Sequence, residues 1–348
     1  MDKTLILAVA GAGKTTEIIN NIKKDDKTLI ITYTENNYNI LKNNIIKKFK
    51  GIPDNIKIYT YFTFLYRFCF LPLKKGFKVK GLDFNSNPNK YIKAKDINYY
   101  YNRVSKKMYH NRLAKICSDY FIDDIIKRIE KYFNYIYIDE IQDFASHDFN
   151  LLLNLIKTNC NILLVGDFYQ HTFDTSRDGN VNSNLYNDYD NYINKIKNSD
   201  SNIKVDTVNF LKSKRCSKQV CEFITEYLKI KIESYNNHDS IIREIDDENT
   251  IEKIANNDNI VKLFYQNSKK YDMKNKDNWG NSKGNTYINT CVVLNKNSYE
   301  KYKKHKLNEL PSSTKNKLYV ALSRATNDVY IINEKYLDKY KKINWTLY

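Results

Sequence analysis

The sequence predicts an α/β protein of two lobes, each a mainly parallel β-sheet flanked by helices. Short apolar runs alternate with longer segments of mixed polar and apolar residues, which is typical of β-α-β units. The length of 348 residues suits two domains of about 150–200 residues each. Three of the apolar runs end in glycine, aspartate or glutamate, and parallel sheets bind ligands at that carboxyl edge.

The first lobe is predicted to cover residues 1–200. Its expected strands are Lys3–Val9, Thr28–Thr32, Lys57–Tyr59, Tyr135–Ile138 and Asn161–Val165, and its expected helices are Lys14–Lys24, Asn37–Phe49 and Ser146–Lys157. A low-complexity run of Asn, Asp, Ser and Tyr from Asp178 to Asn202 suits a surface loop or linker with room for one helix.

The second lobe is predicted to cover residues 201–348. Its expected strands are Ile203–Val208, Ile241–Ile245, Ile260–Phe264, Thr290–Leu294 and Val329–Ile332, and its expected helices are Ser217–Ile232 and Ser312–Ala325. The chain contains no recognisable internal repeat.

A phosphate-binding loop is predicted directly after the first strand, where residues 8–15 read A-V-A-G-A-G-K-T. Gly11 and Gly13 permit a tight turn that aims backbone N–H groups at phosphate oxygens. The helix that follows adds the positive end of its dipole. Lys14 is expected to reach the β- and γ-phosphates, and the Thr15 hydroxyl to bind Mg²⁺. The residues expected to contact the nucleotide are Ala10, Gly11, Ala12, Gly13, Lys14, Thr15 and Thr16. Ala8 stands where such loops usually have their first glycine.

Two carboxylates emerge at the end of a second apolar run, in the segment Y-I-Y-I-D-E-I-Q-D-F at residues 135–144. In a phosphate-loop enzyme the first of them, Asp139, holds the Mg²⁺ that bridges the β- and γ-phosphates. The second, Glu140, is placed to polarise the attacking water. Thr15 and Asp139 are therefore the candidate metal ligands, and ATP and Mg²⁺ the expected cofactors.

A third apolar run ends in polar residues in the segment I-L-L-V-G-D-F-Y-Q-H-T-F at residues 162–173. This segment has two interpretations: an ordinary strand followed by a turn, or a sensor of the γ-phosphate. In the second interpretation Gln170 reaches the phosphate from a neighbouring strand, at the edge where parallel sheets bind ligands.

In this order, the three motifs resemble those of superfamily 1 helicases, and the resemblance extends over nearly the whole chain. The form D-E-x-Q-D at Asp139, Glu140, Gln142 and Asp143 is similar to that of the UvrD/Rep group. The resemblance implies two RecA-like P-loop NTPase lobes, with motifs I to III in the first and motifs IV to VI in the second. It also implies translocation along DNA with 3′→5′ polarity.

Further motifs carry the resemblance along the chain. Thr32-Tyr33-Thr34 resembles motif Ia, whose aromatic residue contacts a DNA base, and the segment T-Y-F-T-F at residues 60–64 resembles motif Ib. L-K-S-K-R-C at 211–216 resembles motif IV and implies that Arg215 is a γ-phosphate ligand. Residues 282–294 resemble motif V, and L-Y-V-A-L-S-R-A at 318–325 resembles motif VI. The last match implies that Arg324 is the arginine finger. An ordinary alternative for Arg324 is a cation that caps the end of its helix.

The chain departs from the family pattern where the family contacts the base and the sugar. No Gln-containing adenine motif precedes the first strand, Lys214 replaces a stacking Tyr, and Thr286 replaces a Glu near the ribose. We expect phosphate chemistry with loose base selectivity. The Trp that commonly follows motif III is absent, and Phe173 or a nearby Tyr is its candidate substitute. The gaps after motif Ib (about 60 residues) and after motif IV (about 55 residues) are too short for large accessory domains, so a minimal form of the motor is expected.

Composition is compatible with nucleic acid as a partner. The chain has 57 Lys and Arg against 40 Asp and Glu, a net charge of +17, and 14% aromatic residues. A basic surface attracts polyanions, and aromatic faces stack on unpaired bases. A bias of the genome toward A and T would give a similar composition. We expect single-stranded DNA as the preferred partner, with contacts from Tyr33, Thr60, Tyr61, Phe62 and Phe173. RNA stays open, since nothing in the sequence reads a 2′-hydroxyl, and so does a protein partner for processive unwinding.

The aromatic segment at residues 59–73 is too short for a membrane span. We expect a core helix there, one edge of which reaches nucleic acid through Tyr61 or Phe62.

The six cysteines form no C-x-x-C pair and are expected to be buried thiols. A metal site of Cys216, Cys221 and His238 is not expected, because it lacks a second ligand pair. Because the apolar run at 5–10 leads straight into the phosphate loop, no signal peptide is expected. An intracellular, cytoplasmic setting follows.

Three functions are compatible with these residues. The first is an ATP-dependent DNA translocase or helicase. The second is an NTPase that acts as a switch or regulatory subunit and needs a protein partner, which the short gaps favour. The third is a binding module without turnover, against which the intact Lys14, Asp139, Glu140 and Arg324 argue.

Overall fold

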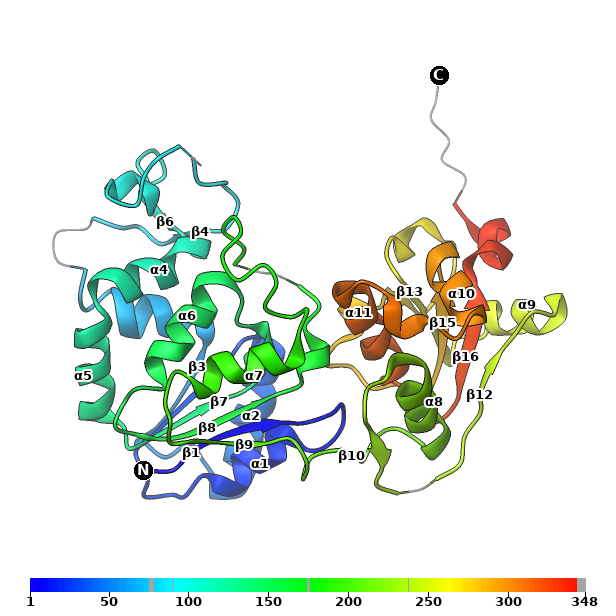
Figure 1. Cartoon of the computed structure of the whole chain (residues 1–348), viewed down its shortest axis with the longest axis horizontal. Coiled ribbons are helices and arrows are strands. Elements are labelled where there is room, and N and C mark those ends of the chain that lie inside the picture. The colour runs from blue at the N-terminus through cyan, green and yellow to red at the C-terminus, as the bar shows by residue number, and fades with distance from the viewer. Residues whose placement is uncertain (75–77, 90, 174–175, 237, 343–348) are drawn as a thin grey trace. The chain divides into compact units, whose positions relative to one another are not determined.

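The computed structural model describes residues 1–74, 78–89, 91–173, 176–236 and 238–342 (Figure 1). By internal contacts the chain divides into two compact units. Unit 1 comprises residues 1–7, 14–166 and 174–206, and unit 2 comprises residues 8–13, 167–173 and 207–348. The division therefore cuts through the phosphate loop and through the segment that follows Gly166, both of which the sequence placed in the first lobe. The lobe boundary near residue 200 stays a prediction.

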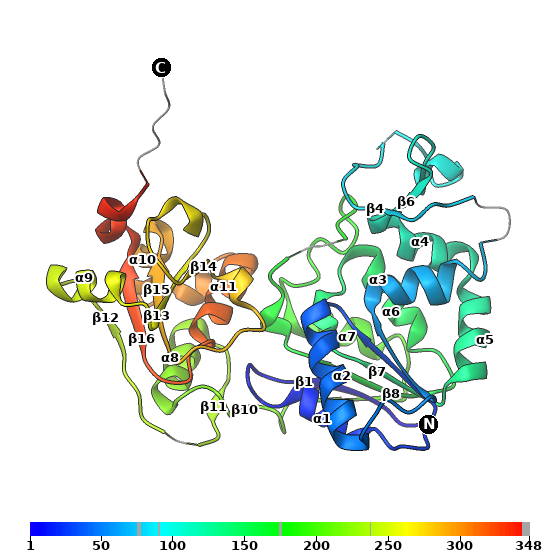
Figure 2. The same ribbon diagram turned by 180° about the vertical axis from the view of Figure 1, so that it is seen from behind.

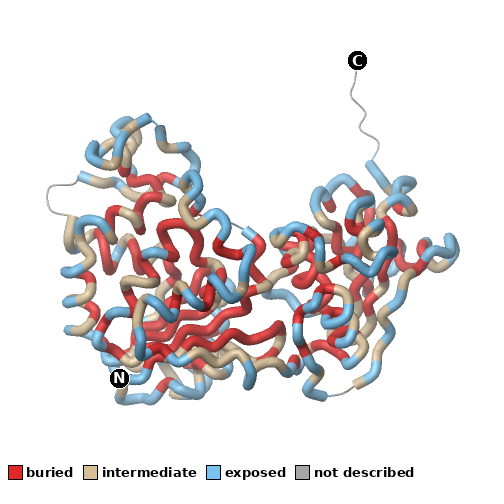
Figure 3. Tube along the Cα trace, in the orientation of Figure 1, coloured by how far each residue is buried: buried red, intermediate tan, exposed pale blue. Residues whose placement is uncertain are grey.

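Unit 1 is built on a six-stranded, all-parallel sheet in the order β3-β2-β7-β8-β1-β9. Its strands are β1 (Lys3–Leu7), β2 (Thr28–Thr32), β3 (Ile56–Thr60), β7 (Tyr135–Ile138), β8 (Asn161–Gly166) and β9 (Ile203–Asp206). The central strands are nearly continuous apolar runs because both of their faces are covered (Figure 3).

Helices cover both faces of this sheet. They are α1 (Lys14–Asn21), α2 (Glu35–Phe49), α4 (His110–Tyr120), α5 (Ile122–Tyr132), α6 (Ser146–Leu155) and α7 (Tyr189–Lys197). Helices α1 and α2 lie on the face seen in Figure 2, and α6 and α7 on the face seen in Figure 1. Helix α2 begins where the Thr34 side chain accepts a hydrogen bond from the Asn37 N–H, as an N-cap residue does.

The aromatic segment after β3 forms the short helix α3 (Tyr61–Thr63) and the π-helix η1 (Phe64–Phe70). Five of the seven η1 residues are buried, which confirms the expected core helix. The gap that follows holds a small three-stranded sheet in the order β4-β6-β5, with β4 at Leu82–Asp83, β5 at Tyr101–Asn102 and β6 at Lys107–Tyr109. The insertion after motif Ib is therefore small, as its length indicated.

Unit 2 is built on a five-stranded, all-parallel sheet in the order β12-β16-β15-β13-β14. These strands are β12 (Ile242–Glu244), β13 (Ile260–Phe264), β14 (Lys276–Asn278), β15 (Asn289–Leu294) and β16 (Val329–Asn333). The helices are α8 (Lys218–Leu228), α9 (Glu248–Asn256), α10 (Lys296–Lys303) and α11 (Ser312–Leu322), and β10 (Lys212–Ser213) pairs with β11 (Glu233–Ser234). The gap after motif IV thus supplies core strands, as expected.

One predicted strand belongs to a different sheet. The sequence assigned 203–208 to the second lobe, whereas β9 pairs with β1 in unit 1, with Lys3 opposite Ile203. That assignment is wrong, because an apolar alternation indicates a strand and not its neighbour. In the part of the chain that the structure describes, no helix combines the length and apolarity needed to cross a membrane. All six cysteines are buried and unpaired, as expected.

Candidate functional site

The phosphate loop joins β1 to α1, and its two glycines have the backbone that the motif requires. Gly11 has φ +75° and Gly13 has φ +95°, values that other residues rarely adopt. Gly11 also packs closely inside unit 2, where an added Cβ would lie 2.7 Å from the Ser213 Oγ. Any side chain at Gly11 would therefore both strain the turn and displace its neighbours.

The loop backbone is hydrogen-bonded within unit 2. The Ala10 N–H donates to the Tyr319 hydroxyl (2.9 Å), and that hydroxyl donates to the Asp167 carboxylate (3.0 Å). The Lys214 N–H donates to the Gly11 carbonyl (3.0 Å). Burial, and then the nearby Asp167, raise the pKa of Tyr319 well above its usual value, so Tyr319 stays a neutral donor. Sequence reasoning missed Tyr319, although it lies inside the segment that resembles motif VI.

In unit 1, Lys14 and Thr15 open α1 directly after this loop, and Asp139 and Glu140 follow β7. Strands β1 and β7 run parallel with β8 between them. Their carboxyl ends therefore lie at the same edge of the sheet, which is where parallel sheets bind ligands. The structure thus brings to one edge of unit 1 the two candidate metal ligands, Thr15 and Asp139. It also brings the candidate phosphate contact, Lys14, to that edge.

The carboxylate pair is held tightly. Asp139 is 1% exposed, and its Oδ1 accepts a hydrogen bond from the Glu140 N–H (3.0 Å). Glu140 has a positive φ of 55°, a conformation that costs energy in a residue other than glycine and that is concentrated at functional sites. Its carboxylate accepts hydrogen bonds from the Gln142 and Asn37 side-chain amides. These two donors fix the side chain expected to orient the attacking water.

The third motif follows β8. Asp167 is buried, and its carboxylate accepts hydrogen bonds from the Tyr169 N–H (3.2 Å) and from the Gln170 side-chain amide (2.8 Å). Asp167, Tyr169 and Gln170 all belong to unit 2. The structure therefore places the candidate γ-phosphate sensor, Gln170, against Asp167. Gly166, just before it, tolerates no Cβ, because that atom would lie 2.6 Å from the Ile141 side chain.

Arg215 and Arg324 lie close together in unit 2. The Arg215 Nη1 donates to the Ser323 carbonyl (3.2 Å). Arg324 is 1% exposed, and its three guanidinium nitrogens donate to the Val320 carbonyl (3.0 Å), the Asn285 carbonyl (3.4 Å) and the Ser323 hydroxyl (3.2 Å). Burial, and then the charge of Arg215, lower the pKa of Arg324 to about 10. Arg324 stays charged near neutral pH.

The residues predicted to contact nucleic acid separate into three environments. Phe62 and Thr60 line a cavity of about 390 Å³ in unit 1, together with Tyr33. Tyr61 does not line this cavity and is only 1% exposed. Tyr61 is thus buried, whereas Phe62 lines the cavity, and a contact of either residue with nucleic acid stays a prediction. Phe173 belongs to unit 2, where its ring is 48% exposed and carries the Lys317 ammonium at 5.4 Å.

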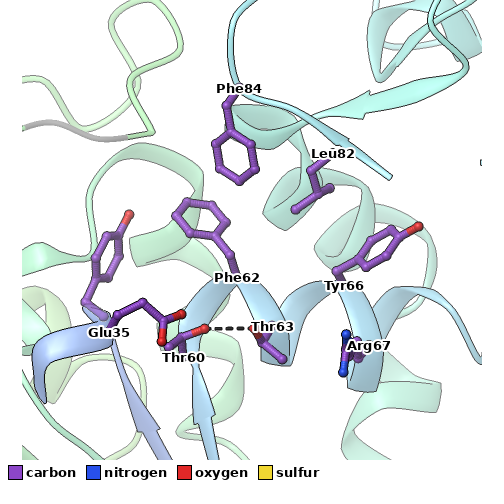
Figure 4. A pocket seen from close by; sticks show the side chains of 9 residues that line it. Glu35, Thr60, Phe62, Thr63, Tyr66, Arg67, Leu82 and Phe84 are labelled. Carbon is purple, nitrogen blue, oxygen red and sulfur yellow. Dashed lines mark hydrogen bonds between the residues drawn. The ribbon is translucent and has the colours of Figure 1, made fainter. Parts of the chain in front are cut away.

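The cavity has aromatic walls from two parts of the chain. Phe62, from the segment resembling motif Ib, and Phe84, from the small insertion, point toward one another (Figure 4), with ring centroids 5.5 Å apart. Phe84 is 55% exposed and stacks on His110 at 4.9 Å. Arg67 and Glu35 are the charged side chains that line the cavity. Sequence reasoning missed Phe84, because a single Phe in an Asn-rich stretch carries no motif.

A buried carboxylate, Asp148, is hydrogen-bonded to two tyrosines at this cavity, of which Tyr33 lines it. Asp148 of α6 accepts hydrogen bonds from the Tyr61 hydroxyl (2.9 Å) and the Tyr33 hydroxyl (3.3 Å). Burial raises the pKa of Asp148 to about 7. Tyr33 and Tyr61 stack with centroids 5.4 Å apart. The two motif tyrosines are therefore held by one acid that the sequence analysis did not single out.

Comparison with known proteins identifies the family. Residues 102–333, two thirds of the chain, match the model of the viral superfamily 1 RNA helicase core domain. The chain belongs to this family of helicase cores. Membership confirms the predicted superfamily, while the UvrD/Rep grouping stays a prediction. The matched region begins after the phosphate loop. A comparison with curated proteins found no match.

Solved structures resemble the helicase core in fold. An arterivirus nonstructural protein 10 (helicase) in complex with DNA superimposes with a TM-score of 0.50 at 11% identity, over 95% of this chain and 60% of that one. A crystal structure of arterivirus nonstructural protein 10 gives 0.50 at 12% identity, over 98% and 62%. This chain thus spans about three fifths of those helicases. The likeness confirms the predicted α/β fold with parallel sheets flanked by helices.

Proposed function

We propose that this helicase core is an ATP- and Mg²⁺-dependent translocase that moves along single-stranded nucleic acid. In this proposal Lys14 and the loop at residues 10–16 hold the phosphates, and Thr15 and Asp139 bind the metal ion. Glu140 orients the water, while Gln170, Arg215 and Arg324 contact the γ-phosphate. Each turnover is coupled to a movement between the two lobes, which advances the strand.

The observation that carries the proposal is the environment of Arg324. A buried cation is costly unless an anion accompanies it. Among the described residues, neither Arg324 nor Arg215 forms an ion pair with a carboxylate, and Arg324 donates only to neutral oxygens. Asp167 acts on the charge of Arg324 only at a distance, so two adjacent cations held in this way favour a bound anion. A nucleotide phosphate is such an anion, and a fixed arginine stabilises the transferred phosphoryl group without reorganisation.

For the strand we propose single-stranded DNA with 3′→5′ polarity. The support is the D-E-x-Q-D form at residues 139–143 and the segments that resemble motifs Ia and Ib, which lie at the aromatic cavity. RNA is the alternative that the description of the matched family favours.

The deciding experiment is steady-state ATP hydrolysis with no nucleic acid, with a single-stranded DNA, and with an RNA of the same sequence. We expect strong stimulation by DNA. Equal or greater stimulation by RNA would overturn the DNA assignment and keep the translocase. Hydrolysis that neither polymer stimulates would favour the switch or regulatory subunit, a reading that the small insertion of unit 1 supports. Displacement of a duplex with a 3′ or a 5′ single-stranded tail then tests the polarity.

A further inference from the structure

Unit 1 contains a second cavity, of about 330 Å³, at the opposite end of the sheet from the nucleotide residues. Three of its lining residues, Lys27, Asn55 and Phe133, come just before β2, β3 and β7. Asp139 follows the carboxyl end of β7 instead. Strands of five residues span roughly 16 Å, so this cavity is separate from the nucleotide edge and from the cavity at Phe62.

The lining of this second cavity is strongly cationic. Lys27, Lys57, Arg128 and Lys131 contribute four positive charges, and Asp54 contributes one negative charge. Among the described residues, none of the four cations forms an ion pair. Four positive charges that converge around a single negative charge repel one another, so an anionic ligand that enters the cavity is favoured by all four.

Arg128 gives the cavity a directed donor. Its guanidinium lies over the Phe68 ring, 4.9 Å from the centroid, and beside the Tyr132 ring at 5.2 Å. Its Nε atom is buried and has no hydrogen-bond partner. A buried donor without an acceptor costs about 1–3 kcal/mol. The two rings thus hold the guanidinium in place, and one N–H is left for an acceptor that the protein does not supply.

Aromatic faces line the same space. Tyr132, the last residue of α5, is 44% exposed, and Tyr59 on the edge strand β3 is half-buried. Cations that follow a phosphate backbone, together with aromatic faces on which bases stack, are the combination that binds single-stranded nucleic acid. The volume is at the lower end of the range for small-ligand sites, which suits one nucleotide.

We propose that this cavity is a second nucleic-acid site, which holds one nucleotide of a strand at the amino end of the sheet. Arg128 and the lysines bind its phosphate, and the tyrosine rings contact its base. The choice of a polynucleotide as the occupant rests on the proposed function. Two sites on one rigid sheet raise the total affinity for a strand long enough to reach both, because the second contact becomes intramolecular. A strand released at the Phe62 cavity during turnover then stays bound to the protein.

The test is binding of a fluorescent single-stranded oligonucleotide to the full chain, measured by anisotropy over a series of salt concentrations without ATP. Arg128→Gln should weaken binding roughly 10-fold and reduce the slope of log K against log salt by about 0.7, the value for one lost phosphate contact on a single strand. Lys127→Gln is the matched control. Lys127 is an exposed cation that precedes Arg128 on α5 and does not line the cavity.

Lys57→Gln keeps the test valid if Arg128→Gln disturbs packing, because Lys57 is exposed and its loss removes no buried contact. It should weaken binding in the same direction. If both variants bind as Lys127→Gln does, the second site is disproved. If a peptide of glutamate and tyrosine loses affinity in Arg128→Gln while the oligonucleotide does not, the occupant is an acidic protein segment and the proposal is overturned.

The same variants separate this inference from the proposed function. Basal ATP hydrolysis should be equal in the wild type and in Arg128→Gln, since the cavity lies away from the nucleotide edge. If nucleic acid fails to stimulate hydrolysis in the wild type but Arg128→Gln still weakens binding, the translocase proposal fails and the second site stands.

Discussion

The charged residues expected at the nucleotide are held differently in the two units. In unit 1, the Asp139 and Glu140 carboxylates accept hydrogen bonds from N–H groups of the backbone and of side-chain amides. In unit 2, Arg215 and Arg324 donate to neutral carbonyl and hydroxyl oxygens, and no carboxylate forms an ion pair with either among the described residues. One unit therefore presents negative charge after a strand. The other presents two arginines that form no direct ion pair with a carboxylate among the described residues, although Asp167 lies close enough to Arg324 to act on its charge.

This difference indicates a division of labour. Carboxylates at the end of β7, beside the helix that Lys14 opens, are suited to hold a metal ion and a water molecule. Fixed arginines that form no ion pair with a carboxylate are suited to charge that develops on the phosphate during reaction. Substitutions in unit 1 should thus impair binding and chemistry together, whereas loss of an arginine in unit 2 should impair chemistry more than binding.

The largest effect is expected from Lys14→Ala. Lys14 is the point charge at the phosphates, so its loss should weaken nucleotide binding and reduce hydrolysis to background. Hydrolysis and binding of a fluorescent ATP analogue measure both effects. Lys23→Ala is the control, because Lys23 is an exposed lysine of the same unit that follows α1 and lies outside the loop at residues 10–16. Turnover near the wild-type rate in Lys14→Ala would disprove the phosphate-loop assignment.

Arg324→Ala should reduce turnover by at least roughly 10²-fold, as expected for a group that stabilises charge in the transition state. Nucleotide binding should stay close to that of the wild type. Arg324→Lys keeps the charge but loses the planar fork, so it should recover only part of the rate. An equal loss of binding and turnover would remove the contrast between the units, and unchanged turnover would exclude Arg324 from the chemistry.

Individual strands show which features of the fold can be predicted from the sequence. The bounds of β2 and β7 were predicted correctly, because both are short apolar runs that the polar residues beside them delimit. The strand at 203–206 was recognised but assigned to the wrong sheet, because its pairing with β1 depends on residues some 200 positions away. Local patterns indicate an element and its ends, and they do not state its neighbour.

The candidate site shows the same limit. Motifs located the residues at strand ends, since glycine, lysine and carboxylate spacing is dictated by phosphate and metal chemistry. Phe84, Asp148 and Tyr319 act through long-range contacts, to Phe62, to Tyr61 and to Ala10 respectively. None of these contacts leaves a local pattern. The burial of Tyr61 was likewise invisible in a segment where nearly every residue is apolar or aromatic.

Among aromatic residues, Phe62 in unit 1 and Phe173 in unit 2 give the next comparison. Phe62→Ala should weaken binding of a single-stranded oligonucleotide by about 1–3 kcal/mol, the contribution of one stacked base. Phe173→Ala should have a smaller effect, because Lys317 lies over the Phe173 ring. Anisotropy without ATP measures both. A larger loss in Phe173→Ala would move the main base contact to unit 2.

The smallest effect on turnover is expected from Asp148→Asn. Asp148 also differs from the buried Arg324 in protonation, because its pKa lies near neutral pH. Burial raises its pKa to about 7, while Arg324, with a pKa of about 10, stays charged between pH 5 and 8. The fold holds a proton on Asp148 that the unfolded chain, with an aspartate pKa near 3.9, releases. Wild-type stability from this group should therefore fall as the pH rises from about 4 to 7, by at most about 1.4 kcal/mol per unit, and then level off. Asp148→Asn removes this dependence and keeps hydrogen-bonding atoms beside the Tyr33 and Tyr61 hydroxyls.

Urea unfolding of the wild type and of Asp148→Asn at pH 5, 6, 7 and 8 checks the sign. The variant should gain stability relative to the wild type as the pH rises, and the gain should end near pH 7 to 8. A difference that stays constant over this range would mean that Asp148 is charged inside unit 1. In that case unit 1 would hold a second buried carboxylate charge besides Asp139, stabilised by the Tyr33 and Tyr61 hydroxyls.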